Sequence, residues 1–232
     1  TFADCFRIIE SYDIRDELPK RALEYLEKGS SGGPEAPAET PKPGDSRFER
    51  VRNRLIANNY MALERAAQTA ARLGFDPLIL SSSITGNTAD IAAAHVAMAQ
   101  EVLSSGHPLS PPCCLISGGE TTVQVRGKGK GGRNMEFALQ AAWQMRDWPE
   151  HSLLIASLGS DGTDGPTDAA GAVARPDTVR RARNQGMDAS DYLARNDSYN
   201  FFKPLDDLIV TGPTRTNVMD LRLVLVGSRV GG

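Results

Sequence analysis

Cations and glycines are concentrated in one short stretch of the chain, residues 113–136. The cations in it are Arg126, Lys128, Lys130 and Arg133. A helix is expected to begin near Arg133, and the first turn of a helix has unpaired main-chain N–H groups and the positive end of the helix dipole. A cation is disfavoured at that end, so Arg133 indicates an anionic partner, and the glycines would let the main chain approach it closely. The stretch therefore predicts an anion-binding site.

A second group of functional side chains is acidic and follows an apolar segment that ends at Leu158. Asp161, Asp164 and Asp168 lie there in a glycine-rich turn without a cation. Within such a turn Asp161 and Asp164 can face one small volume, where they could hold Mg²⁺ or one of them could accept a hydroxyl proton. The alternative is that these Asp-Gly pairs only form turns. Cations beside a carboxylate pair suit phosphoryl transfer, which requires charge neutralisation and positioning.

The elements that must position these residues alternate between strands and helices. Strands are expected at residues 55–57, 78–80, 113–116, 153–158, 209–210 and 221–226, and helices at 59–73, 88–105, 133–145 and 177–185. This order predicts an α/β fold with mainly parallel sheet layers flanked by helices. After the strand at 113–116 we expect a tight turn at 117–120 and an alternating strand at 121–126. Polar loops should follow strands at the ligand-binding edge of the sheet, with the sequences SGGET, GSDGTDGPTD and TGPTRTN.

The first part of the chain has a different character. Helices are expected at residues 2–14 and 19–27, the second ended by Gly29. Residues 28–46 are rich in Gly, Ser, Pro and Glu and almost free of apolar side chains. Such a composition indicates a loop or linker.

The glycine motif also permits a second interpretation. Gly127, Gly129 and Gly132 spell G-x-G-x-x-G between an expected strand and a helix, which is the fingerprint of dinucleotide binding. The expected strand alternates with polar residues, unlike a buried parallel strand, and the acid expected further on could only be Glu150, in a loop. His95, which lies on an expected helix face, is interpreted as a core residue, and the histidines lie too far from the polar loops to favour a Ser-His-Asp hydrolase.

Composition limits the class of protein. The net charge is −3, which gives no indication of nucleic-acid binding, and no apolar run approaches the ~18 residues of a membrane helix. The three cysteines are an odd number, and two of them are neighbours in an expected strand, which favours a reducing, cytoplasmic setting. The chain begins at Thr1 without a Met, which suggests processing or a fragment.

Three long motifs of the chain resemble one known family. They are SGGETTVQVRGKGKGGRNMEFAL, ASLGSDGTDGPTDAAGA and TGPTRTNVMDLRLVLV. In this order they resemble the C-terminal MOFRL domain of the kinases that phosphorylate glycerate on its 2-hydroxyl. The resemblance implies residues 110–232 as a MOFRL-like α/β domain, and residues 1–109, with the linker at 28–46, as a segment completing an N-terminal Rossmann-like domain. The chain would then be the C-terminal portion of a two-domain enzyme whose N-terminal part is missing.

The resemblance also implies ATP and Mg²⁺ as cosubstrates, D-glycerate as acceptor and a site between the two domains. Arg133 would stabilise the transferring phosphoryl group, and Asp161 and Asp164 would serve metal or catalysis. Substrate or phosphate binding would fall to Gly118, Gly119, Glu120, Lys130, Asn134 and Asn217. The chain departs from the pattern at Arg215, where a small residue, usually Gly, is expected.

Two other functions remain open at this point. One is NAD(P)H-dependent reduction of hydroxypyruvate, a label that members of the family sometimes carry. The other is non-catalytic binding of a small anion by the fragment. The expected partners are the small-molecule substrate, the missing N-terminal part of the enzyme and, as a further candidate, a second copy in a homodimer.

Overall fold

The computed structural model describes residues 1–149 and 153–227. The chain divides into two compact units, Thr1–Arg54 and Leu55–Gly232. Glu150 and His151, which the sequence analysis considered, lie outside the described residues. Within the described ranges, no helix combines the length and the apolar character needed to cross a membrane.

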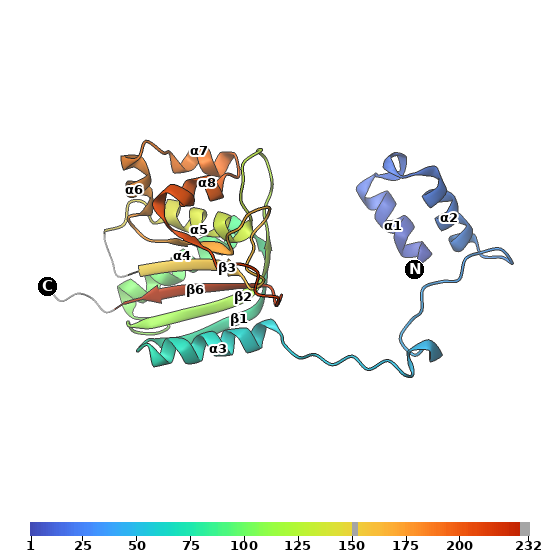
Figure 1. Cartoon of the computed structure of the whole chain (residues 1–232), viewed down its shortest axis with the longest axis horizontal. Helices are drawn as coiled ribbons and strands as arrows, with labels where there is room; N and C mark the ends of the chain where they lie inside the picture. The colour runs from blue at the N-terminus through green and yellow to red at the C-terminus, as the bar shows by residue number, and fades with distance from the viewer. Residues whose placement is uncertain (150–152, 228–232) are drawn as a thin grey trace. The chain divides into compact units, whose positions relative to one another are not determined.

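The first unit is built from two helices, α1 (Phe2–Tyr12) and α2 (Lys20–Ser31), with 3-10 turns η1 (Arg15–Glu17) and η2 (Ser46–Phe48) (Figure 1). Both predicted helices are confirmed, but Gly29 lies inside α2 instead of ending it. A Cβ atom at Gly29 would lie 2.5 Å from the Phe2 ring, so this glycine lets α1 and α2 approach each other. Residues 32–45 contain no helix or strand, in agreement with the predicted linker.

The second unit contains a six-stranded sheet. Its strands are β1 (Asp76–Asn87), β2 (Cys113–Thr122), β3 (Leu153–Gly159), β4 (Gly171–Ala174), β5 (Leu208–Ile209) and β6 (Asp220–Val226), in the spatial order β1-β2-β6-β3-β4-β5. Strands β1 and β2 are parallel, and the other neighbouring pairs are antiparallel. The predicted α/β class is confirmed, and the expectation of mainly parallel layers is corrected. The reason is that β6, the last strand in the part of the chain that the structure describes, lies between β2 and β3 and runs against both.

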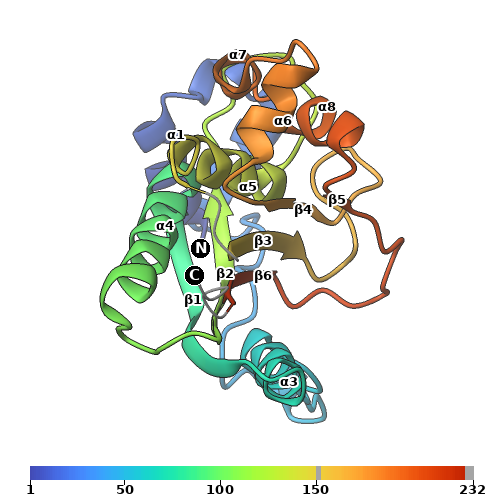
Figure 2. The same ribbon diagram turned by 90° about the vertical axis from the view of Figure 1, so that its left-hand side faces the viewer.

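Helices cover both faces of this sheet. Helix α3 (Asn59–Arg72) lies on one face, and α4 (Thr88–Ser105) and α5 (Arg133–Gln144) lie on the other (Figures 1 and 2). The short helices α6 (Thr178–Asn184), α7 (Ala189–Ala194) and α8 (Ser198–Phe202) and the turn η3 (Lys203–Leu205) pack outside α5. The larger apolar core forms between the sheet and α4 and α5, and a smaller one forms under α3. Most predicted helix starts are confirmed, with Asn58 and Asn87 as the N-caps of α3 and α4.

The structure differs from the predicted elements in three places. The tight turn at 117–120 is absent, because β2 runs unbroken to Thr122 and residues 123–132 form the loop instead. The strand at 55–57 is absent as well, since these residues precede α3 in irregular chain and Leu55 and Ile56 are 77% and 83% exposed. Strand β4 and helices α7 and α8 have no counterpart in the predicted elements.

The division between the two compact units lies between residues 54 and 55. Strand β1 precedes residue 109 and pairs along its length with β2, which follows it, so both belong to one sheet. The role of residues 1–109 in a neighbouring domain of a larger enzyme stays a prediction.

Candidate active site

The face of the sheet under α4 and α5 changes from apolar to charged along β6. Directly opposite residues of antiparallel strands share a face, so β2, β6 and β3 form rows across it. The rows are, in order, Leu115–Val224–Ile155, Ser117–Arg222–Ser157 and Gly119–Asp220–Gly159. The small Ser and Gly residues on each side leave room around the two charged side chains of β6. The sheet thus builds a polar site at the end where β2 and β3 finish.

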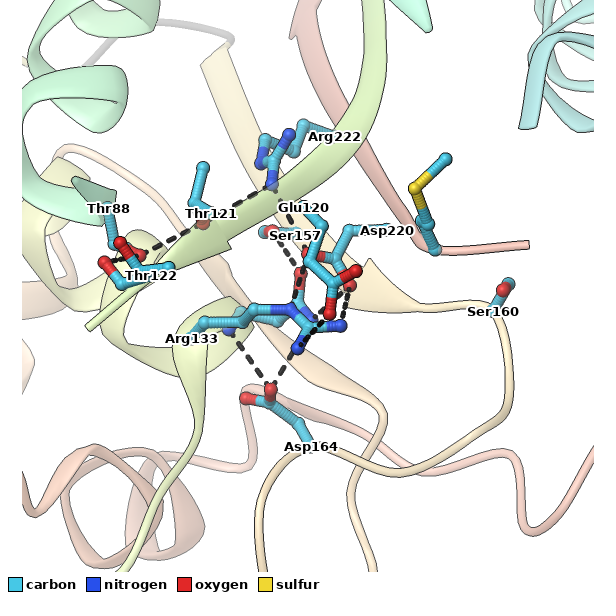
Figure 3. Close-up of polar contacts among 12 residues, drawn as sticks. Thr88, Glu120, Thr121, Thr122, Arg133, Ser157, Ser160, Asp164, Asp220 and Arg222 are labelled. Atoms are coloured by element: carbon cyan, nitrogen blue, oxygen red, sulfur yellow. Dashed lines mark hydrogen bonds and ion pairs between the residues drawn. The ribbon is translucent and has the colours of Figure 1, made fainter. Parts of the chain in front are cut away.

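Asp220, on β6, holds the guanidinium of Arg133 through an ion pair. The Arg133 Nε and Nη2 atoms donate to the two carboxylate oxygens of Asp220 at 2.7 and 3.0 Å (Figure 3). The Asp220 side chain is fully buried, whereas that of Arg133 is 34% exposed. The hydrogen bond to Asp220 raises the pKa of Arg133 above its ordinary value, with burial acting in the opposite direction. Such a bidentate pair fixes the plane of the guanidinium as well as its position.

The remaining Nη1 of Arg133 lies 2.9 Å from Oε1 of Glu120, whose side chain is 52% exposed. The predicted anionic partner of Arg133 therefore exists, but it is supplied by the protein's own carboxylates. The two partners differ in kind: Asp220 is buried and bidentate, while Glu120 makes a single contact near solvent. An external anion would replace Glu120 far more readily than Asp220, because an exposed ion pair contributes at most about 1 kcal/mol.

Asp164 occupies the N-terminus of α5. Its carboxylate accepts from the main-chain N–H groups of Asn134 at 3.1 Å and Met135 at 2.8 Å. Gly132, the N-cap residue, has no side chain to do this, and a Cβ atom there would lie 2.3 Å from Asp164 Oδ1. Burial raises the pKa of Asp164 to about 6, although these hydrogen bonds act to lower it. Asp164, predicted as a catalytic and metal-binding residue, is placed here as a cap for the helix that carries Arg133.

Asn134 joins the two acids. Its Nδ2 donates to Asp220 Oδ1 at 3.0 Å and to Asp164 Oδ1 at 3.3 Å, and its Oδ1 accepts from Ser157 Oγ at 2.6 Å. The side chain is buried, with all its contacts inside the protein. Asn134, predicted to bind substrate, is seen here to organise Asp220 and Asp164.

Hydrogen bonds join the loop that follows β3 to the loop that precedes β6. The Asp161 carbonyl accepts from Thr214 N at 3.0 Å, and Ser160 Oγ accepts from Val218 N at 2.8 Å. The Asp161 side chain accepts from Thr163 and is partly exposed, and that of Asn217 accepts from Met219 N at 3.1 Å. The predicted convergence of these loops is thus found. No group of three or more metal-ligating side chains occurs in the described ranges.

Arg215 has a left-handed backbone, with a φ of 61°. Glycine adopts this conformation with little strain, whereas most other residues do not. The positive φ of this turn explains why a small residue, usually glycine, is expected at position 215.

Several N–H groups of the glycine and lysine loop, which the prediction assigned to an anion, are paired inside the protein. The N–H groups of Gly127, Gly129 and Lys130 donate to Asn196 Oδ1, the Arg195 carbonyl and Asp197 Oδ1 respectively. A Cβ atom at Gly127 would lie 2.4 Å from the Arg195 carbonyl oxygen, and one at Gly129 would lie 2.5 Å from the same atom. The G-x-G-x-x-G pattern is explained by this close packing. Lys130, predicted to bind phosphate, lies with its Nζ 4.2 Å from the centre of the Tyr199 ring.

Close packing also explains the two glycines of the SGGET motif. A Cβ atom at Gly118 would lie 1.9 Å from Asn59 Oδ1, on the α3 face of the sheet. A Cβ atom at Gly119 would lie 2.2 Å from the Ile84 carbonyl oxygen, and Gly119 has a φ of 119°. Gly118 faces away from Arg133, so the structure does not bring every predicted binding residue to one place.

Two residues of this site, Asp220 and Arg222, were missed by the sequence predictions. Arg222 is 1% exposed, and its Nη2 lies 3.3 Å from Asp220 Oδ2 and 3.4 Å from Thr121 Oγ1. Its Nε and Nη1 have no hydrogen-bond partner among the described residues, and burial lowers its pKa. The signal in the sequence was two charges at alternate positions of the otherwise apolar strand DLRLVLV.

His95 borders the same cluster from α4. It is 2% exposed, with its ring nitrogens 2.7 Å from the Ile91 carbonyl oxygen and from Ser117 Oγ. Burial lowers its pKa to about 4, so the ring is neutral at physiological pH. The prediction of a core histidine is confirmed.

Comparison with known proteins agrees with the resemblance seen in the motifs. Residues 113–220 match the model of the MOFRL family. The chain is 38% identical over 232 residues to glycerate 2-kinase from Pyrococcus horikoshii, covering 100% of this chain and 51% of that protein. It is 38% identical over 229 residues to a protein from Agrobacterium vitis named as a hydroxypyruvate reductase, covering 98% of this chain and 49% of that one.

The fold of the chain is also similar to that of a solved structure. The crystal structure of glycerate kinase from Thermotoga maritima superposes with a TM-score of 0.75 at 34% identity, covering 97% of this chain and 50% of that one. The chain thus spans about half the length of the relatives it matches. Residues 113–220 are therefore similar to the MOFRL family, and nearly the whole chain is similar to about half the length of the glycerate 2-kinase from Pyrococcus horikoshii and of the glycerate kinase from Thermotoga maritima.

Proposed function

We propose that this chain is part of a kinase that transfers the γ-phosphoryl group of ATP to the 2-hydroxyl of D-glycerate. The observation that carries the proposal is the Arg133 guanidinium, held by buried Asp220 on one edge and turned toward half-exposed Glu120 with the other. Phosphoryl transfer depends on fixed positive groups aimed at the charge that develops on the phosphoryl oxygens. Relatives named as glycerate kinases support the choice of acceptor.

In this mechanism Arg133 meets the phosphoryl oxygens through Nη1, and Glu120 gives up its single contact when the anion arrives. Asp220, Asn134 and Asp164 hold Arg133 and the start of α5 in place. Little reorganisation is then needed during the reaction, which is where electrostatic stabilisation is most effective. Asn217 and Lys130 lie on exposed loop segments and are the predicted contacts to the rest of the ligand.

Mg²⁺ would accompany ATP in such a reaction, because it neutralises the phosphate oxygens when bound. Asp161 is the carboxylate in the predicted pair that fits it better. The Asp161 side chain is partly exposed and, among the described residues, accepts hydrogen bonds only from Thr163, whereas both oxygens of Asp164 accept from α5. Mg²⁺ is commonly held by one or two carboxylates together with the substrate phosphates, so Asp161 and the nucleotide would suffice.

The other half of the enzyme is the expected partner, since the relatives are about twice as long as this chain. The free cysteines Cys5, Cys113 and Cys114 favour the reducing cytoplasm as its location.

The experiment is a direct assay of the complete enzyme that contains this chain. With ATP, Mg²⁺ and D-glycerate we expect 2-phosphoglycerate, identified by ³¹P NMR so that the 2- and 3-phosphates are distinguished. A parallel reaction with NADH and hydroxypyruvate, followed by the loss of NADH absorbance, tests the reductase alternative. Consumption of NADH without phosphoglycerate would contradict the proposal. The packing of the glycine motif against residues 195–198 gives no support to dinucleotide binding.

A further inference from the structure

A small cavity lies beside the candidate site at the same end of the sheet. Its volume is about 150 Å³. It is formed where α4 begins and where the chain leaves β2, between α5 and the end of α7. The residues that matter for its chemistry are Thr88, Arg126, Glu136, Gln140, Ala194 and Asn196. None of the predicted binding or catalytic residues lines it.

The cavity has a buried acid at its inner side. Glu136 is only 6% exposed, and burial raises its pKa to about 7, with a hydrogen bond from Gln140 acting to lower it. A carboxyl group in this environment can accept a hydrogen bond from a hydroxyl, or donate one when protonated. The neutral amide of Gln140 lies beside it in the cavity wall. This side of the cavity is suited to hydroxyl groups.

The outer side of the cavity carries a cation. Arg126 is exposed, and its Nη2 donates to the neutral amide oxygen of Gln124 at 2.6 Å. No ion pair to Arg126 occurs within residues 1–149 and 153–227. A guanidinium without a carboxylate partner, next to the positive end of α4, is suited to a ligand carboxylate.

The volume limits what can enter. An engineered protein cavity of about 150 Å³ takes up benzene, and glycerate, with about seven non-hydrogen atoms, is of similar size. The small volume, the carboxyl group of Glu136 on one side and the guanidinium of Arg126 on the other together favour a small hydroxy acid as the ligand.

We propose that this cavity binds a three-carbon hydroxy acid, with the ligand carboxylate at Arg126 and a hydroxyl at Glu136. The inference rests on the proposed function in that the acid would be the phosphoryl acceptor. Arg133 and Glu136 are three residues apart on α5, so their Cβ atoms lie about 5–6 Å apart on the helix surface. Thr88, in the cavity wall, also donates to Thr121 Oγ1 at 2.9 Å, which in turn contacts Arg222. The cavity and the Arg133 cluster are therefore connected parts of one polar end of the domain.

The test is calorimetric titration of the 232-residue chain with D-glycerate, without ATP. Propionate, which lacks the hydroxyls, and glycerol, which lacks the carboxylate, are the comparison ligands. We expect D-glycerate to bind at least tenfold more tightly than either. Arg126→Gln and the cavity-filling change Ala194→Trp should each weaken binding at least tenfold. Arg65→Gln, on α3 at the opposite face of the sheet, is the matched control and should bind like the unchanged chain.

Absence of D-glycerate binding overturns the proposal, as does equal binding by Ala194→Trp when its circular dichroism and unfolding curve match those of the unchanged chain. Equal affinity for propionate overturns the contact between the hydroxyl and Glu136. If the complete enzyme makes 2-phosphoglycerate and Ala194→Trp leaves its KM for glycerate unchanged, the cavity assignment is wrong and the proposed function stands. If the chain binds D-glycerate and the complete enzyme makes no phosphoglycerate, the proposed function is wrong and the cavity assignment stands.

Discussion

The two halves of β6 differ sharply on the face that α4 and α5 cover. Val224 and Val226 are fully buried among apolar side chains, as a core strand requires. Asp220 and Arg222, on the same face and equally buried, carry opposite charges. Apolar burial stabilises a fold in proportion to area, whereas buried charges require partners and rarely add net stability. The charged half of β6 therefore positions Arg133, whereas the apolar half contributes to the hydrophobic core that stabilises the sheet.

Removing the carboxylate at the centre of the charged half should have the largest effect. Asp220→Ala leaves Arg133 and Arg222 near each other without the acid that both contact. We expect the free energy of unfolding to fall by about 3–5 kcal/mol, the usual result of breaking a buried ion pair. Urea unfolding of the chain measures it, with the substitution Glu64→Ala, at an exposed position of α3, as a control. A loss below about 1 kcal/mol would show that Asp220 does not organise the cluster.

The charged half should also make stability depend on pH in an unusual direction. The pKa of Asp164 rises from 3.8 to about 6 and that of Glu136 from 4.5 to about 7 on folding. Groups whose pKa is raised in the folded state stabilise it at low pH and lose that contribution as the pH rises through the folded pKa. We expect the chain to lose on the order of 4 kcal/mol of stability between pH 5 and pH 8.

Urea unfolding at several pH values between 5 and 8 measures this dependence. Asp164→Asn should make the curve flatter, whatever its effect on the absolute stability. An unchanged slope in Asp164→Asn would mean that Asp164 does not titrate in this range.

The smallest effect on stability is expected at Arg222, although its side chain is large and buried. Arg222→Met removes a charge with two nitrogens that lack partners among the described residues, while Asp220 keeps Arg133 and Asn134. Replacing a buried charge by an apolar side chain is often neutral or stabilising, so we expect a change within about 1 kcal/mol. Ile155→Ala, one row away in the apolar half, should by contrast cost about 2–5 kcal/mol. The thermal midpoints of the two variants give the comparison, and a loss at Arg222→Met as large as that at Ile155→Ala would remove the distinction between the halves.

Local patterns in the sequence predicted much of this architecture. The helix starts at Asn59, Thr88 and Arg133 followed from capping residues and periodicity. The polar loops after β3 and before β6 were placed at one edge of the sheet, and they do converge there, although the predicted SGGET loop is part of β2.

What could not be predicted depends on contacts between distant residues. Gly118 and Gly119 were interpreted as a turn, because their packing partners Asn59 and Ile84 are far away in sequence. The direction of β6 between β2 and β3 is a tertiary property with no local signal. For the same reason Asp164 was interpreted as a metal ligand: its position at the N-terminus of α5 depends on a loop that returns from β3.

The central claim is that Arg133, held by Asp220, stabilises the transferring phosphoryl group. The most direct measurement is kcat of the complete enzyme with Arg133→Ala and Arg133→Lys, under saturating ATP and D-glycerate, beside the control Arg65→Ala. We predict that Arg133→Ala lowers kcat by about 10²–10³-fold, that Arg133→Lys restores only part of it because lysine cannot bind Asp220 in bidentate fashion, and that Arg65→Ala has no effect. An Arg133→Ala enzyme that stays folded and turns over at the unchanged rate would contradict the account.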